Sequence, residues 1–320
     1  MLERKNIERL DAAELMRSGR FDEKYSYFLA EQLRYVRAAA LKVKKAPLKA
    51  FEVFPVTTDI PVGAKTAVQR IYDSVGMAKI ISNYGDDLPR IDILAAEKPV
   101  HVRTLGAAYG YSVTDLQNAQ FAGMNINAEK AEAAREAIDR KINAIAWKGD
   151  AEYGITGFID NPNLTEYTVA ASGTRSSTKF IDKTDEQIIA DLNGLAAAVE
   201  TATSFEEHPN TLLLPPKAYT IVSTKRLSYS DHTILDFFRA AHPNITRVIA
   251  VGELEGASSS GKDIMVAGFF DPKYIKLEIP IRFEQMPIQY RNLEYVIDCI
   301  ASTTGVTVQI PNAFAKAEGV

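Results

Sequence analysis

The feature that most constrains this chain is a long helical pattern that stops at a run of turn-forming residues. The pattern occupies Ala128–Trp147, AEKAEAAREAIDRKINAIAW. One line of apolar side chains recurs along it at helical spacing: Ala131, Ala134, Ile138, Ile142 and Ile145. Gly149 follows, and glycine readily takes the left-handed conformation that ends a helix. A helix of this length with a single apolar stripe must pack on one side only and leave its other faces to water.

Composition excludes several classes of protein. The 320 residues are enough for two ordinary domains, and a formal net charge of −4 is unlike that of a protein that coats nucleic acid. The first twenty residues are charged throughout and lack the apolar centre of a signal peptide. No apolar run reaches the roughly 20 residues that a membrane helix needs. These features are typical of a soluble, globular, cytoplasmically made protein.

The stretch Phe54–Ile93 is rich in strand-forming residues and interrupted by Pro and Gly. Within it, AKTAVQRIY and MAKIISNY flank Asp73–Gly76, which we interpret as a hairpin turn. Neither face of this hairpin is uniformly apolar, since one face carries Thr66, Val68, Arg70 and Tyr72. A two-stranded hairpin without a core is marginally stable in water, so we expect it to lie on something else.

The remainder of the chain is predicted to hold two kinds of structure. Before the hairpin, Glu23–Lys45 has the pattern of a helix with a basic end. After the long helix, helical and strand patterns alternate from Thr184 onward, which favours a compact α/β module. The last part, from Leu293 to Phe314, predicts a long strand, a turn at Thr304–Gly305 and a returning strand.

No pattern in the sequence predicts catalysis. Gly256–Asp263, GASSSGKD, matches a phosphate-binding loop except that Asp263 replaces the hydroxyl residue, and a strand rather than a helix is expected to follow. We therefore interpret it as a hairpin loop. The four histidines show no metal-ligand spacing, and Cys299 alternates with apolar residues as a small buried side chain does. We predict no catalytic, cofactor-binding or metal-binding residues.

The order of these parts resembles that of the major capsid proteins of tailed bacteriophages, which have the Hong Kong 97 fold. The resemblance rests on the arm-like N-terminal helix, the hairpin without a core, the long helix ending in WKGD before GITGFIDNP, and the module that holds NTLLLPPKAYTIVS. The closing segment, with its Gly-Val-Thr-Val strand before a proline, fits the same order. The chain is most similar to the branch of short capsid proteins that lack a cleaved scaffolding segment.

The resemblance implies an α+β fold with a specific domain map. In that map, residues 1–49 form the N-terminal arm and residues 50–95 the extended loop. Residues 96–175 form a peripheral domain whose spine helix is 128–147. Residues 176–280 form the axial domain, and residues 281–320 return to the peripheral domain.

The resemblance also implies a structural, non-enzymatic function. The chain would self-assemble into pentamers and hexamers of an icosahedral shell that encloses phage DNA, would be made in the host cytoplasm, and would reside in the virion. Its partners would be other copies of itself, a portal, decoration or scaffolding proteins, and packaged double-stranded DNA bound without sequence specificity, with no membrane and no cofactor. The expected subunit contacts lie on the extended loop, at Val68, Arg70, Tyr72, Met77 and Lys79.

Two other functions fit parts of the sequence. An encapsulin-like nanocompartment shell has the same fold and packages enzymes rather than DNA. A soluble α/β enzyme that binds phosphate through the Gly256 loop is the third hypothesis, and Lys262 would then be its basic residue.

Overall fold

The computed structural model describes residues 45–75, 92–122 and 126–320. The predicted helix Glu23–Lys45 lies outside these ranges except for its last residue, and so do Met77 and Lys79. The elements described below belong to one compact unit, Pro47–Val320.

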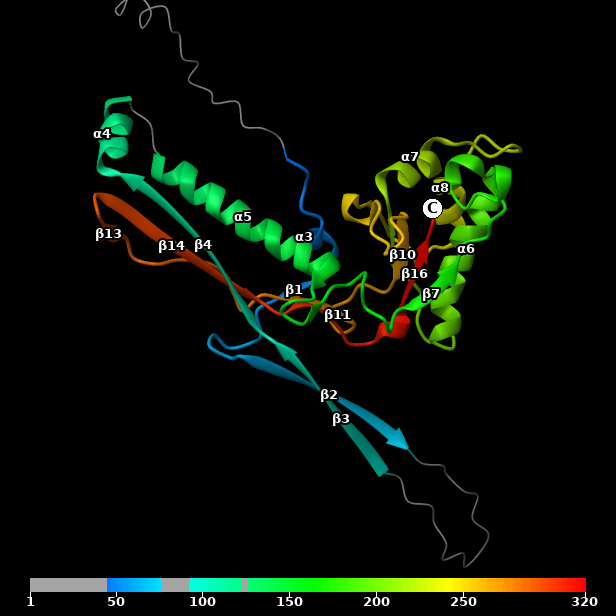
Figure 1. The fold of residues 1–320 in the computed structure, drawn as a ribbon. Helices are drawn as coiled ribbons and strands as arrows, with labels where there is room; N and C mark the ends of the chain where they lie inside the picture. Colours follow the sequence, from blue (N-terminus) through cyan, green and yellow to red (C-terminus); the bar gives the residue numbers. More distant parts are fainter. Residues whose placement is uncertain (1–44, 76–91, 123–125) are drawn as a thin grey trace, which may run out of the picture. The chain divides into compact units, whose positions relative to one another are not determined.

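The long helix packs on an antiparallel sheet (Figure 1). Helix α5 covers Ile126–Lys148, and it lies along β4 (Arg103–Ser112) and β14 (Glu294–Thr303). These two strands pair over their full ten residues, and the sheet is completed by β12 (Ile281–Gln285) and β13 (Gln289–Arg291), which both pair with β14. The long helix predicted at residues 128–147 is present, and Gly149, at φ +76°, follows its last residue as the sequence indicates.

Helix α4 (Val113–Ala122) begins directly after β4 because Ser112 and Asp115 form a reciprocal cap. The Ser112 hydroxyl accepts from the Asp115 amide at 3.0 Å, and the Asp115 carboxylate accepts from the Ser112 amide at 3.2 Å. The cap turns the chain from strand to helix within one residue.

A second group of short elements surrounds the C-terminal end of α5. Helix α3 (Ala50–Val53) leads into β1 (Val56–Thr57), which pairs with β11 (Ile275–Glu278), and β11 pairs in turn with β15 (Gly305–Val308). The pair β5 (Gly149–Asp150) and β6 (Ile155–Thr156) follows α5. Five buried aromatic rings join these pieces into one core: Phe54, Trp147, Phe158, Phe270 and Phe314.

The α/β module predicted after Thr184 is present and has its own apolar core. Its sheet has the order β7-β16-β10-β8-β9, and its strands are β7 (Thr165–Thr168), β16 (Phe314–Glu318), β10 (Ile264–Gly268), β8 (Thr211–Leu214) and β9 (Arg247–Ala250). Three helices pack with this sheet: α6 (Asp185–Ala202), α7 (Pro216–Thr224) and α8 (Ile234–Ala241). Single 3₁₀ turns occur at Thr174–Ser176, Phe180–Asp182, Gly252–Leu254 and Pro311–Ala313. Pro216 at the first position of α7 has the fixed φ that favours helix initiation.

The predicted hairpin exists, but its turn lies elsewhere. Strand β2 (Thr66–Val75) pairs with β3 (Asp92–His101) over ten residues, so Asp73, Ser74 and Val75 pair with Leu94, Ile93 and Asp92. The predicted turn at Asp73–Gly76 is therefore wrong. Long regular pairing overrode the local turn propensity of Asp-Ser-Val-Gly, and the connection falls within residues 76–91, outside the described residues.

Two other expectations need correction. Residues 50–57 do not belong to the extended loop, because Ala50, Val53 and Phe54 are buried in the aromatic core. The strand after Thr304 does not return along β14, since β15 pairs with β11, and β16 lies between β10 and β7. Residues 314–320 therefore belong with the five-stranded sheet and not with the returning strands.

Candidate functional site

The β2–β3 ribbon lacks a core of its own along the part whose side chains the structure describes. No residue is buried within 65–70 or 97–101, and Val68 is 53% exposed. Arg70 forms an ion pair with Glu97 across the two strands at 3.0 Å, and both side chains are largely exposed. An exposed pair of this kind contributes at most about 1 kcal/mol to stability. Ten backbone pairs hold the ribbon together, and within 65–70 and 97–101 neither face is buried.

The ribbon is closed at its base, where the Val102 amide donates to the Lys65 carbonyl at 3.0 Å. The chain then enters β4 at Arg103 and joins the sheet under α5. Of the five predicted contact residues, Val68, Arg70 and Tyr72 belong to strand β2. Met77 and Lys79 lie outside the described residues, so whether all five lie together stays a prediction.

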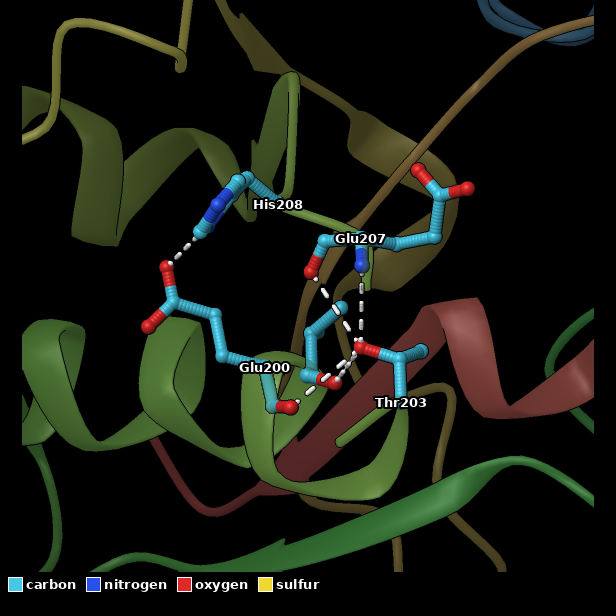
Figure 2. A network of polar contacts seen from close by, with 5 residues as sticks. Glu200, Thr203, Glu207 and His208 are labelled. Carbon is cyan, nitrogen blue, oxygen red and sulfur yellow. Dashed lines mark hydrogen bonds and ion pairs between the residues drawn. The ribbon is translucent and has the colours of Figure 1, made fainter. Parts of the chain in front are cut away.

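The C-terminal end of α6 carries a dense polar network (Figure 2). The Thr203 hydroxyl oxygen lies within hydrogen-bond distance of the carbonyls of Val199, Glu200 and Glu207, at 2.9, 3.3 and 3.2 Å, and accepts from the Glu207 amide at 3.3 Å. The Glu200 carboxylate reaches the His208 ring at 2.8 Å. The network fixes the loop that follows the helix.

Two residues of this loop have left-handed backbone, Ser204 at φ +54° and Phe205 at φ +63°. The Phe205 amide donates to the Glu200 carbonyl and the Ser204 amide to the Thr201 carbonyl, which is the Schellman pattern of helix termination. Glycine usually occupies the first of these positions, since each side chain there costs about 1–2 kcal/mol. The sequence has no glycine here, so pattern reasoning missed this loop.

Negative charge gathers at the same end of the module. Glu200, Glu206 and Glu207 lie within one loop and helix turn, and the Tyr274 hydroxyl donates to Glu207. That hydrogen bond, with burial and the neighbouring carboxylates, raises the pKa of Tyr274 to about 12. The tyrosine stays neutral at all ordinary pH values and serves as a donor to the acidic loop.

A buried asparagine joins α5 to two distant segments. Asn143 is 6% exposed, its carbonyl oxygen accepts from the Ala50 amide at 2.9 Å, and its amide nitrogen donates to Glu253 at 2.7 Å. No sequence pattern indicates this role, because a polar residue on a charged helix is expected to be solvent-exposed. Asn143 holds the start of α3 and the turn after β9 against the long helix.

Among the described residues, no three His, Cys, Asp or Glu side chains gather as metal ligands, and no described helix is long and apolar enough to span a bilayer. Burial, and secondarily Asp298, raises the pKa of the Cys299 thiol, which keeps it protonated and a poor nucleophile.

The Gly256–Asp263 loop does not have the form of a phosphate cradle. The Asp263 carboxylate accepts from the Gly256 amide at 2.7 Å, and the Ser258 amide donates to the Lys262 carbonyl. The loop leads into strand β10 and not into a helix, unlike a phosphate-binding loop. The predicted hairpin is wrong, because β9 and β10, the strands on either side of the loop, both pair with β8 and not with each other.

Comparison with known proteins identifies a family that matches this chain. The model of the family described as major capsid protein matches residues 76–320. Among curated proteins, no sequence matches the chain.

Solved structures share the fold at low sequence identity. The capsid of Myoviridae phage XM1 is 16% identical, with a TM-score of 0.77 over 91% of this chain and 98% of that one. A structure from Mycobacterium phage Bobi is 14% identical, with a TM-score of 0.61 over 93% and 99%. The capsid of the native GTA particle is 13% identical, with a TM-score of 0.60 over 89% and 94%.

The three structures match 91%, 93% and 89% of this chain. They confirm the Hong Kong 97 fold, and they do not favour the nanocompartment or the phosphate-binding enzyme. The family model covers most of the chain, from the end of β2 to the last residue. The chain therefore belongs to the major capsid protein family and is a structural, non-enzymatic protein of a virion shell.

Proposed function

We propose that this capsid protein assembles first as pentamers and hexamers, and that these build an icosahedral shell around double-stranded phage DNA. The observation that carries the proposal is the β2–β3 ribbon. Two long strands pair with each other while none of the residues 65–70 and 97–101 is buried. Isolated two-stranded ribbons are marginal in water, so a neighbouring copy of the chain supplies the missing surface.

The proposed domain map follows the sequence map with revised edges. Residues 1–49 are the N-terminal arm, and the extended loop is narrowed to about 58–101. The peripheral domain holds α5 with β4 and the strands of 281–303. The axial domain is the α/β module, to which β16 is added.

The proposed subunit contacts remain Val68, Arg70, Tyr72, Met77 and Lys79. Support comes from Val68, a large apolar residue left more than half exposed on an otherwise regular strand. Burial of such a side chain against a neighbour contributes about 1–2 kcal/mol. Repeated at every copy of the ribbon in a closed shell, this increment gives assembly a strong cooperative drive.

The further partners are a portal, scaffolding or decoration proteins, and the packaged DNA, with assembly in the host cytoplasm. Support for DNA contact without sequence specificity is compositional. A net charge of −4 leaves no excess of basic residues for tight DNA binding, so the shell encloses the DNA without binding it tightly.

Removal of the ribbon tests the proposal. Because the Lys65 carbonyl and the Val102 amide are 3.0 Å apart, a short Gly-Ser linker can replace residues 66–101 without disturbing the base. The variant should keep the helical circular dichroism of the parent and remain soluble, but it should form no closed shells by electron microscopy. A variant that closes shells as readily as the parent would show that the ribbon is not a subunit contact.

A further inference from the structure

The α/β module has two ends of opposite character. Helix α6 has 18 residues and so spans about 27 Å between them. The acidic end is formed by the loop after α6, which leads into β8 at Thr211. The basic end is formed by the residues before α6, the start of α7 and the Gly256–Asp263 loop. Strands β8, β10 and β16 run between the two ends, because the Asn210 amide donates to Gly268 at one end and Asp263 accepts from Gly319 at the other.

The acidic end presents an aromatic knob. Phe205 is 68% exposed, and it stands between Glu200 and Glu206 in a segment that holds three glutamates and no lysine or arginine. Ser204 and Phe205 both have left-handed backbone. The Thr203 hydroxyl holds the loop through bonds to Val199 on one side and Glu207 on the other (Figure 2). Strained backbone persists where the surroundings fix it, and it is concentrated at functional surfaces.

The loop is thus pre-organised. In a Schellman motif the residue at the Phe205 position commonly packs back on the helix, whereas here its ring faces solvent. A rigid exposed aromatic loses little conformational entropy when it is buried by a partner, which makes it a strong anchor for an interface.

The basic end holds a cavity of about 430 Å³. Its floor is apolar, formed by Phe180, Ala218 and Ile221, and Ile181 at its edge is 75% exposed. An apolar cavity of about 150 Å³ already holds a benzene molecule, so the space is sufficient for a phenyl ring.

Charged groups line the same cavity. Three lysines and one aspartate are present: Lys179, Lys217, Lys262 and Asp263. The aspartate is engaged by the Gly256 amide, and Lys217 lies 3.6 Å from Glu255 in an exposed pair. Counted by side chains alone, the lining is net positive, with three lysines against one aspartate, around an apolar floor.

The geometry points to a head-to-tail contact between copies of this chain, in which Phe205 of one copy enters the Phe180–Ala218–Ile221 cavity of the next. Glu200 and Glu206 would then face the lysines of the rim. The two surfaces are matched in both apolar character and charge, and they lie at opposite ends of one rigid module. A contact of this heterologous kind closes into a ring when the rotation between copies allows it. This inference rests on the proposed function and names a surface that would hold its rings together.

A pair of glycine variants tests the knob. Phe205→Gly removes the ring and relieves the left-handed strain, and Ser204→Gly relieves strain at the adjacent position and keeps the ring. Neither change should lower the Tm of the unassembled subunit. Phe205→Gly should raise the protein concentration needed for ring or shell formation by at least tenfold in light scattering, whereas Ser204→Gly should leave it unchanged.

Charge reversal tests the pairing. Glu206→Lys should impair assembly at low salt, and Lys179→Glu together with Lys262→Glu should impair it likewise. A chain that carries all three changes should regain assembly, because the reversed charges again attract. Phe205→Tyr, which keeps the ring, should assemble as the parent does.

Three results would overturn this inference. One is normal assembly of Phe205→Gly while the ribbon deletion still fails, which would leave the proposed function standing. Another is a lower Tm in Phe205→Gly than in Ser204→Gly at concentrations below assembly, which would place the ring against its own chain. A parent chain that stays monomeric at every concentration and salt would contradict both the inference and the proposed function.

Discussion

The two hydrogen bonds of the Asn143 side chain give the sharpest test of how the long helix is held in place. These bonds have opposite polarity, since the side chain accepts from the Ala50 amide and donates to Glu253. Asn143→Asp has the same shape and keeps the first bond. It replaces the donor with a second carboxylate oxygen 2.7 Å from that of Glu253, where two ionised carboxylates cannot coexist.

Two estimates bound the stability that Asn143→Asp should lose. The lost hydrogen bond to a charged group is worth about 1.5–3 kcal/mol. The upper limit is the cost of keeping one proton on the carboxylate pair at pH 7. Because pH 7 lies about three units above an ordinary carboxyl pKa, and each unit is worth about 1.36 kcal/mol, this cost is about 4 kcal/mol. We expect Asn143→Asp to lower the free energy of unfolding by about 3 kcal/mol at pH 7.

The pH dependence has a definite sign. The pair in the variant has a folded pKa raised above its unfolded value, so its full stability is present below about pH 4 and is lost as pH rises through the folded pKa. The deficit relative to the parent should therefore shrink steadily from pH 7 to pH 4. Glu253→Gln added to Asn143→Asp restores a donor opposite the new carboxylate and should recover most of the stability at pH 7.

The assay is urea unfolding followed by the fluorescence of Trp147, the single tryptophan, which is buried beside Phe54 at the end of the same helix. Measurements are made below the concentration at which shells form. If Asn143→Asp matches the parent at pH 7, or if Glu253→Gln fails to rescue it, then the bond between α5 and the turn after β9 does not carry the stability assigned to it.

Three further predictions concern the core. Gly157→Ala should lower the free energy of unfolding in urea by about 3 kcal/mol, because its added Cβ would lie 2.2 Å from the Gly149 nitrogen. Gly154→Ala meets no atom within 4 Å, so it should cost only about 1–2 kcal/mol, from its left-handed backbone. Similar losses in the two variants would contradict this explanation. Lys183 and Asp191 form a fully buried ion pair in the α/β module. Lys183→Ala should lower the free energy of unfolding by about 3–5 kcal/mol, because it leaves the Asp191 charge buried without a partner. The double variant Lys183→Met, Asp191→Leu should recover most of this loss, and failure to recover it would refute the explanation. The Cys299 thiol, buried and with a raised pKa, should resist a thiol reagent at pH 8 in the folded protein and react once urea unfolds it; rapid native labelling would contradict its burial.

The parts that local chemistry specifies were predictable from sequence. The stop of α5 at Gly149, the cap between Ser112 and Asp115, and the start of α7 at Pro216 each depend on one or two neighbouring residues. The absence of an apolar face on the ribbon was visible in the same way, because alternate residues of a strand share a face.

The parts set by distant pairing were not predictable. Strand β15 follows β14 in the sequence but pairs with β11, and nothing within Gly305–Val308 identifies that partner. Local propensity likewise placed a turn at Asp73–Gly76, where the structure continues the strand. Phe54 reads as a strand residue in a β-rich segment, yet its contacts with Trp147 and Phe158 make it a core residue. Phe205 was missed because its left-handed conformation depends on Thr203 and Glu207, not on a glycine.

Electron microscopy of the purified full-length chain tests the central claim most directly. We expect closed shells built from five-fold and six-fold rings, in which density for the β2–β3 ribbon lies on a neighbouring copy. The same preparation of the chain lacking residues 66–101 should show folded subunits without shells. A full-length chain that gives only monomers, or shells in which the ribbon contacts no neighbour, would contradict the account.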